Sequence, residues 1–243
     1  MTTLASKFLL TSAFVLLFAS AAFAQVSSGK ITYERKTNLY KKFKGDDVKE
    51  WLREEDKNKV DVFELYFNDS MSLFKPQESE LRERMSWATD KNVVFQDLLA
   101  NTRLTVKDVW GEKIFVEDSL WKRKWKITDS KRNIAGYNCR KAVWQADDST
   151  RIYAWYAEEL ITSTGPESFC GLPGTILGLA TEDGGVIYFA KTVEVSKQNV
   201  VAMVPAKGKN KIYKTAEIKA KLEKDFSKNP WGRQMIRNMF GLW

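Results

Sequence analysis

The sequence contains no histidine. This absence excludes Ser-His-Asp and Cys-His catalysis, and it also excludes metal sites built from imidazole. The serines beside the Gly-Pro-rich segment at 165–178 lie in no Gly-x-Ser-x-Gly motif that would indicate an esterase-type nucleophile. The sequence therefore predicts no catalytic residue, no cofactor and no metal site.

Long apolar runs are also scarce. One run, from Phe8 to Phe18, follows Lys7 and is followed by small residues that end in Ala22-Phe23-Ala24. A basic residue, a short apolar run and an Ala-x-Ala ending are typical of a secretory signal peptide, and the alternative is an uncleaved anchor. We expect residues 1–24 to be removed after Ala24, so that the protein is periplasmic or secreted.

Cysteine is rare, with Cys139 and Cys170 as the two examples. An even number of cysteines in an oxidising compartment favours a disulfide between them, and the alternative is two separate buried thiols. A thiolate nucleophile is a weaker interpretation because no histidine is present to activate it.

The excess of basic over acidic residues is modest for a chain of 243 residues. Lys and Arg number 39 against 31 Asp and Glu, which gives a formal net charge of +8. Charged residues make up 29% of the chain, and both signs are interspersed along it. This pattern indicates a solvated surface rather than a nucleic-acid-binding stripe.

What the sequence does contain is a series of short segments with strand character. In the first, Ile31, Tyr33 and Arg35 fall on one face of an alternating pattern. Later segments pair across turn sequences as β-hairpins. The predicted hairpins are Val60–Phe67 with Met71–Lys75, Tyr137–Gln145 with Thr150–Ala157, and Thr175–Thr181 with Val186–Val195, and a further strand is predicted at Arg123–Ile127. Residues 25–205 are therefore predicted to form a mainly β, antiparallel domain.

The chain changes character after Pro205. Ile218, Leu222 and Phe226 recur on one face of a helix that Thr215 is expected to cap, and Asn229-Pro230 begins a second helix. Residues 206–243 are thus predicted to be a helical extension. Its Trp231–Trp243 segment combines apolar and basic residues, so it is a candidate for peripheral membrane or partner contact; the alternative is that it closes the open end of a sheet.

The Gly-Pro-rich segment predicts a tight turn. Pro173 presets its own φ, and Gly174 tolerates positive φ, so Leu172–Thr175 is expected to form a type II turn. We assign Gly171, Leu172, Pro173 and Gly174 an architectural role as a rigid entry to the hairpin that follows.

Aromatic residues are abundant, with 9 Trp, 8 Tyr and 14 Phe. Trp125, Trp144, Tyr153 and Trp155 form a candidate ligand groove, and the alternative is that they fill the concave face of a sheet. Three acidic pairs lie at 147–148, 158–159 and 182–183, where we expect turns or surface positions rather than a pair of catalytic carboxylates.

The segment Gly171-Leu172-Pro173-Gly174-Thr175-Ile176 resembles the signature of the GLPGLI family, which comprises secreted or periplasmic proteins of unknown function found mostly in Bacteroidetes. Three further blocks are similar to that family, at 134–142, at 153–156 with Gly165-Pro166, and at 65–70. Thr175 departs from the signature, which has leucine at this position. Both cysteines fall within matching blocks.

The resemblance implies no enzyme class and no catalytic residues. By fold-level analogy it implies a strongly curved antiparallel sheet or half-barrel with a few covering helices, similar to carriers of lipid or lipoprotein segments. The leading hypothesis is a non-enzymatic binding or accessory protein of the cell envelope that shelters an apolar ligand or a partner segment. The alternatives are a histidine-free carboxylate hydrolase and a structural subunit of an outer-membrane receptor assembly.

Overall fold

The computed structural model describes residues 25–43, 52–78, 84–109, 111–147 and 150–241, and the predicted signal peptide lies outside these ranges. The strands are β1 Gly29–Asn38, β2 Asn58–Phe67, β3 Met71–Pro76, β4 Val93–Asp97, β5 Thr102–Val109, β6 Glu112–Ser119, β7 Lys126–Ile134, β8 Tyr137–Gln145, β9 Arg151–Ala157, β10 Thr175–Thr181, β11 Val186–Val195 and β12 Ile212–Tyr213. The helical segments are α2 Leu39–Lys42, η1 Glu54–Asp56, η2 Ser86–Ala88, η3 Val200–Met203, α4 Thr215–Phe226 and α5 Pro230–Met239.

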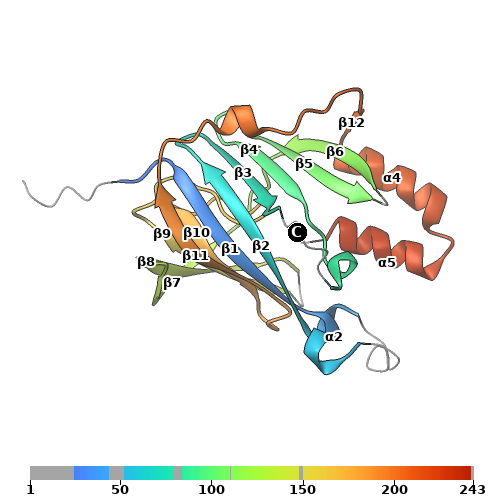
Figure 1. The fold of residues 1–243 in the computed structure, drawn as a ribbon, viewed down its shortest axis with the longest axis horizontal. Coiled ribbons are helices and arrows are strands. Elements are labelled where there is room, and N and C mark those ends of the chain that lie inside the picture. Colours follow the sequence, from blue (N-terminus) through green and yellow to red (C-terminus); the bar gives the residue numbers. More distant parts are fainter. Residues whose placement is uncertain (1–24, 44–51, 79–83, 110, 148–149, 242–243) are drawn as a thin grey trace, which may run out of the picture.

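The described strands form one sheet of twelve, in the order β12-β6-β5-β4-β3-β2-β1-β11-β10-β9-β8-β7. Neighbours are antiparallel except for the parallel pair of β12 and β6. The sheet is open, with β12 and β7 at its two edges, and α4 and α5 lie beside the β5–β6 end (Figure 1). The mainly β prediction is therefore confirmed.

The three predicted hairpins are also confirmed, as β2–β3, β8–β9 and β10–β11. The strand predicted at Arg123–Ile127 is shifted, because β7 begins at Lys126 and continues to Ile134. Arg123 instead packs into the interior, where it donates hydrogen bonds to the Ser168 carbonyl oxygen at 2.8 Å and to its hydroxyl at 3.0 Å.

The main core lies on one face of the sheet. Alternation along β1 buries Ile31 and Tyr33, which lie opposite Leu65 and Phe63 of β2. The long connection between β9 and β10, residues 158–174, contributes Phe169 and other buried residues to the same cluster. An apolar stripe with a period of two thus becomes a filled core because the chain supplies its own cover.

The C-terminal helices form a second, smaller cluster. Ile218 and Leu222 of α4 pack with Ile236 of α5 and with Val116 of β6. The N-cap of α4 is Lys214 and not the predicted Thr215, which is the first residue of the helix. α5 begins at Pro230 after the N-cap Asn229, as the Asn-Pro pair predicts. The helices are therefore attached to the β6 end of the sheet through side chains predicted from the four-residue spacing.

Candidate functional site

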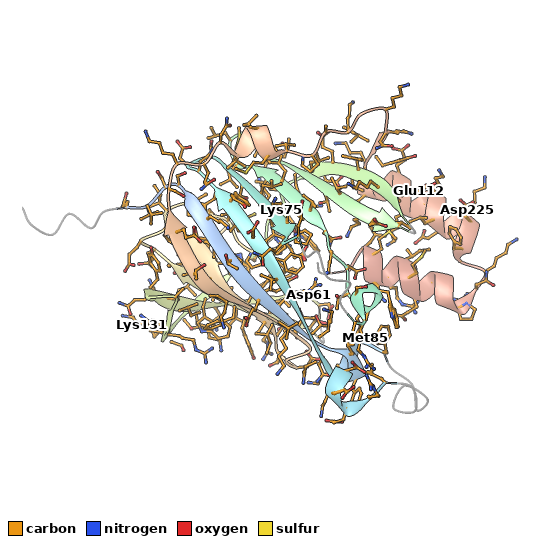
Figure 2. All side chains as sticks on the ribbon, in the orientation of Figure 1. Asp61, Lys75, Met85, Glu112, Lys131 and Asp225 are labelled. Carbon is orange, nitrogen blue, oxygen red and sulfur yellow. The ribbon has the colours of Figure 1, made fainter. Side chains whose placement is uncertain are left out.

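The face of the sheet that carries the core changes from apolar to polar along the strand order. Register places Arg35 opposite Asp61, Gln96 opposite Arg103, and Arg103 opposite Asp118. Because cross-strand partners lie on the same face, these side chains share the face that Ile31 and Phe63 cover elsewhere. Figure 2 shows Asp61 near the middle of the molecule, far from Lys131 at the β7 edge. The polar half of this face is the candidate functional site.

At its centre is a buried ion pair. Arg35 Nη2 lies 2.8 Å from Asp61 Oδ2, and both side chains are almost fully buried. The Thr89 hydroxyl donates to the same Asp61 oxygen at 2.8 Å. Burial alone would raise the pKa of Asp61, but the hydrogen bond and charge of Arg35 lower it below its usual value. Asp61 is therefore held ionised inside the protein.

Glu167 reaches this pair from the connection between β9 and β10. Its Oε1 accepts from the Tyr188 hydroxyl at 2.7 Å and lies 3.7 Å from Arg35 Nη1, and its Oε2 accepts from Asn92 Nδ2 at 3.2 Å. Glu167 is 1% exposed, and its backbone has a φ of 55°, which is rare for a non-glycine residue. Strained residues of this kind cluster at functional sites.

Burial lowers the pKa of Arg35, but this effect is outweighed by Tyr188, Glu167 and Asp61, which together raise the pKa above its ordinary value. The guanidinium therefore stays charged, and it is the cation that both buried carboxylates share.

Lys107 of β5 continues the network outward. Its Nζ donates to Asn92 Oδ1 at 3.3 Å, and the Asn92 amide in turn donates to Glu167. Within the described residues, Lys107 has no carboxylate within ion-pair distance. Burial lowers the pKa of Lys107, an effect that the more distant charges of Glu167 and Asp90 only partly offset. The ammonium is thus a cation without a close counter-charge.

A cavity of about 710 Å³ lies beside this network. It is lined by residues of β4, β5 and β6, by Glu167 and Ser168, by the segment after β6 and by the end of α5. Its polar lining includes Arg103, Lys107 and Asp118, and its apolar lining is Val94, Val116, Leu120, Trp121, Met239 and Phe240. The volume falls within the range typical of small-molecule sites.

Several buried polar atoms near this cavity have no hydrogen-bond partner among the described residues. They are Gln96 Oε1, Arg103 Nε and Arg123 Nε. Gln96 is fully buried, and its amide nitrogen donates to the Glu167 carbonyl oxygen at 3.2 Å. Buried polar atoms are normally paired, so these three are exceptions among the described residues.

A second cavity, of about 350 Å³, lies on the other side of Glu167. Both cavities are lined by Asn92, Glu167 and Gly241. The smaller one is also lined by Arg35, Tyr188 and Arg237, among others. The two spaces therefore adjoin at Asn92, Glu167 and Gly241.

The four aromatic residues of the candidate groove do not share one surface. Trp144 is buried, lies 6.3 Å from Trp125 between ring centres, and packs against Phe169. Tyr153 and Trp155 are partly buried and occupy the positions of β9 that alternate with its fully buried residues. Their centres are 6.5 Å apart, and the Lys141 ammonium lies 3.9 Å from the Tyr153 ring centre. None of the four lines either of the two cavities.

The predicted type II turn is replaced by a tighter one. The Gly174 amide donates to the Leu172 carbonyl at 2.8 Å, which makes a three-residue turn centred on Pro173. The Thr175 amide donates to Leu160 instead, at 2.9 Å. The Gly171 amide donates to the Ser163 hydroxyl oxygen at 2.9 Å, so this segment is fixed by the connection in which it lies.

The predicted disulfide is absent, because Cys139 and Cys170 are both buried free thiols. Cys139 lies on β8, opposite Ala157 of β9. Cys170 lies in the connection, where its carbonyl oxygen accepts from Trp125 Nε1 at 3.0 Å. Burial raises the pKa of the Cys139 thiol to about 12 and also raises that of Cys170.

No cluster of three or more His, Cys, Asp or Glu side chains that would suit a metal ion occurs in the described ranges. No helix in the same ranges combines the length and the apolar character needed to cross a bilayer.

Sequence reasoning missed the network of Arg35, Asp61, Glu167 and Lys107. One signal was available, because alternation along the first strand assigns Arg35 to the same face as Ile31 and Tyr33. A charge on an apolar face indicates a buried partner. The partners could not be identified, because they lie on other strands and in the 158–174 connection.

Comparison with known proteins finds one family model that matches part of the chain and several solved structures with a similar fold. A family model described as "Protein of unknown function (Porph_ging)" matches residues 144–178, which include the Gly-Leu-Pro-Gly segment. No curated protein matches the chain.

The fold is similar to that in two solved structures titled "Structure of PNGF-II", in the C2 and P21 space groups. Their TM-scores are 0.52 and 0.51, each at 17% identity over 77% of this chain. An uncharacterized conserved protein from Thermus thermophilus has a TM-score of 0.40 at 6% identity, over 84% of this chain and 99% of its own. This chain spans 31% of the PNGF-II chains, and the likeness concerns the fold alone.

Proposed function

We propose that this chain is a non-enzymatic binding or accessory protein that holds a small amphipathic ligand in the larger cavity. The observation that carries the proposal is the cavity itself, about 710 Å³ in volume, with an apolar side and a polar side. A ligand would bury its apolar part against the apolar side of the lining and place its polar part beside Arg103, Lys107 and Asp118.

The lining of the cavity supports an amphipathic rather than a wholly apolar ligand. Val94 and Val116 flank Thr105 on the neighbouring strands, and Met239 and Phe240 approach from the end of α5. These side chains offer an apolar surface beside Lys107. The apolar core around Trp144, in contrast, is already occupied by Phe169 of the chain's own connection.

The proposal includes the shape of the sheet. We infer that the sheet is strongly curved, as in half-barrel carriers of lipids or lipoprotein segments, with the core and the cavity on its concave side. Support comes from the positions of the 158–174 connection and the α5 end, which line one cavity together with β4, β5 and β6.

We also propose membership of the GLPGLI family and a periplasmic or secreted location. The family match at residues 144–178 supports the first proposal, because it spans both the Tyr153–Tyr156 block and the Gly-Leu-Pro-Gly signature. The N-terminal segment with its Ala-x-Ala ending supports the second. The partner would then be an envelope ligand or an envelope protein.

A carboxylate hydrolase is the second candidate, because Glu167 and Asp118 line the same cavity. It is less favoured, since both Glu167 oxygens already accept hydrogen bonds and Asp118 is engaged by Arg103 and Thr215. A general acid or base needs an oxygen that can reach a substrate.

A subunit docked to a receptor or membrane through residues 231–243 is the third candidate. The described part of this segment packs Met235, Ile236, Met239 and Phe240 into the cluster with α4 and β6. That packing leaves less of the apolar face for a partner, so this candidate is also less favoured.

The uncharged fluorescent probe N-phenyl-1-naphthylamine tests the binding proposal. We expect it to bind with one-to-one stoichiometry and increased fluorescence, and we expect Thr105→Phe, which adds bulk inside the cavity, to reduce its affinity at least about tenfold. The matched control is Lys113→Phe, which adds the same ring at an exposed position of β6. Equal binding by both folded variants would contradict the proposed site, and no binding by the wild type would contradict the proposal.

A further inference from the structure

The larger cavity follows strand β5 between two cations. Arg103 and Lys107 both line it, and they are four residues apart, which is about 13 Å along an extended strand. Thr105 lies between them on the same face, with Val94 and Val116 on the flanking strands. An elongated ligand that lies along β5 would therefore contact apolar side chains of the protein at its middle and a protein cation at each of its ends.

The two cations differ in how far the protein already neutralises them. Arg103 Nη2 lies 3.6 Å from Asp118 Oδ2, and Asp118 also accepts from the amide and the hydroxyl of Thr215. Lys107 donates to the neutral amide oxygen of Asn92 at 3.3 Å, and it forms no ion pair with any residue that the structure describes. An ammonium has three donors, so two remain for a ligand.

The two carboxylates whose charges act on Lys107 are each held by another cation. Glu167 lies 3.7 Å from Arg35. Asp90 lies 3.4 Å from the Lys42 ammonium. These carboxylates attract Lys107 at a distance, but none of them supplies a contact charge. The position beside Lys107 and Asn92 is thus a place in the cavity where an added negative charge would find an unmatched partner, and Lys107 is held there by Asn92, whereas Lys122, which also lines the cavity, is exposed to solvent.

The Asn92 amide explains why the ammonium keeps a fixed position without a counter-ion. Asn92 accepts from Lys107 and donates to Glu167, which in turn accepts from Tyr188. A polar chain anchored in the core therefore positions the Lys107 side chain before any ligand arrives. Such preorganisation reduces the ordering cost of binding a charged group.

We propose that the ligand of this cavity carries an anionic group, a carboxylate or a group of similar size, and that the Lys107 ammonium binds it while the apolar body lies along Thr105 toward Arg103. The inference rests on the proposed binding function and names the ligand class: small amphiphiles with one anionic head.

The test compares dodecanoate with 1-dodecanol by isothermal titration calorimetry, below the concentration at which either aggregates. The two probes share an apolar chain and differ in the charge of the head. We expect the wild type to bind dodecanoate about tenfold or more tightly than the alcohol, since one hydrogen bond to a charged group contributes on the order of one tenfold step or two.

Substitutions then assign the charge preference to a residue. We expect Lys107→Met to lower the affinity for dodecanoate about tenfold and to leave that for dodecanol unchanged. Lys107→Arg keeps the charge and should retain the preference, which separates loss of charge from loss of folding. Lys113→Met removes an exposed lysine of β6 and should change neither affinity.

The outcomes distinguish the inference from the function on which it rests. Equal affinity for the two probes, unaffected by Lys107→Met, would overturn the anionic head group and leave the binding protein standing. A preference that Arg103→Met abolishes and Lys107→Met does not would overturn the assignment to Lys107. Failure of both probes to bind would count against the proposed function itself.

Discussion

At the scale of single residues, the structure depends on a charge buried with its partner. Asp61 is 1% exposed, forms an ion pair with Arg35 and accepts a hydrogen bond from Thr89. The ammonium groups of Lys59 and Lys91 lie 3.3 and 3.7 Å from its other carboxylate oxygen. Removal of one member of such a pair leaves the other charged and unmatched in the interior. The desolvation penalty of each charge therefore lowers the stability of the folded protein only when its partner is removed.

We expect Asp61→Asn to lower the free energy of unfolding at pH 7 by about 3–5 kcal/mol, because Arg35 would lose its nearest counter-charge. Urea denaturation of the wild type and the variant measures this difference. Asp225→Asn, an exposed substitution on α4, is the control and should change stability by less than about 0.5 kcal/mol.

The same pair makes a prediction about pH. The folded pKa of Asp61 is below its ordinary value of about 3.9, so its contribution is fully present above that pH and is lost as pH falls through the folded pKa. The stability difference between wild type and Asp61→Asn should therefore shrink below about pH 4. If the stability difference between the wild type and Asp61→Asn stays constant down to the pH of acid unfolding, the lowered pKa of Asp61 is contradicted.

The two cysteines give a second prediction at this scale. Cys139 is fully buried and has a pKa of about 12, and Cys170 is also buried, so neither supplies a reactive thiolate at neutral pH. We expect iodoacetamide to modify neither residue in the native protein and both in denaturant without reductant, as measured by intact mass. Protection from alkylation in denaturant until reductant is added would instead indicate a disulfide.

At the scale of elements, the connection between β9 and β10 has the largest influence on the site. It places Glu167 at the ion pair, Phe169 in the core and the Leu172–Gly174 turn at the start of β10. Gly174 is essential to this path. A Cβ atom on Gly174 would lie 2.2 Å from the Ala157 carbonyl oxygen, and the φ of Gly174 is 153°.

We expect Gly174→Ala to lower the free energy of unfolding by about 3 kcal/mol or more, since backbone would have to move. Gly184→Ala is the matched control: its φ is 68°, but a Cβ there meets nothing within 4 Å, so strain alone should cost about 1 kcal/mol. Chemical denaturation of both variants measures the difference. Equal effects would show that the close approach to Ala157 is unimportant.

Local pattern predicted the strands well because each hairpin is encoded within about twenty residues. Val186–Val195 and Thr175–Thr181 were predicted with their observed bounds, since Gly184-Gly185 marks the turn between them. The 158–174 connection was harder, because its course depends on contacts with strands far away in sequence. The Glu167–Tyr188 and Gln96–Glu167 hydrogen bonds are examples.

At the scale of the whole molecule, the open sheet has one half filled by its own chain and one half that retains a cavity. Phe169 packs against Trp144 in the first half, while Lys107, Val94 and Val116 line the second. The sequence alone could predict an aromatic-rich β domain, but it could not distinguish filled from open regions of one face. That distinction arises from which side chains the connection and α5 bring to the sheet.

The direct test of the account is an NMR measurement of where a ligand binds. In protein with labelled methyl groups, we expect intermolecular NOEs between the chain of dodecanoate and the methyl groups of Val94, Val116 and Met239. Contacts to the ring protons of Tyr153 and Trp155 should be absent. NOEs confined to those two aromatic residues, or dodecanoate that binds without reaching Val94 and Val116, would contradict the account.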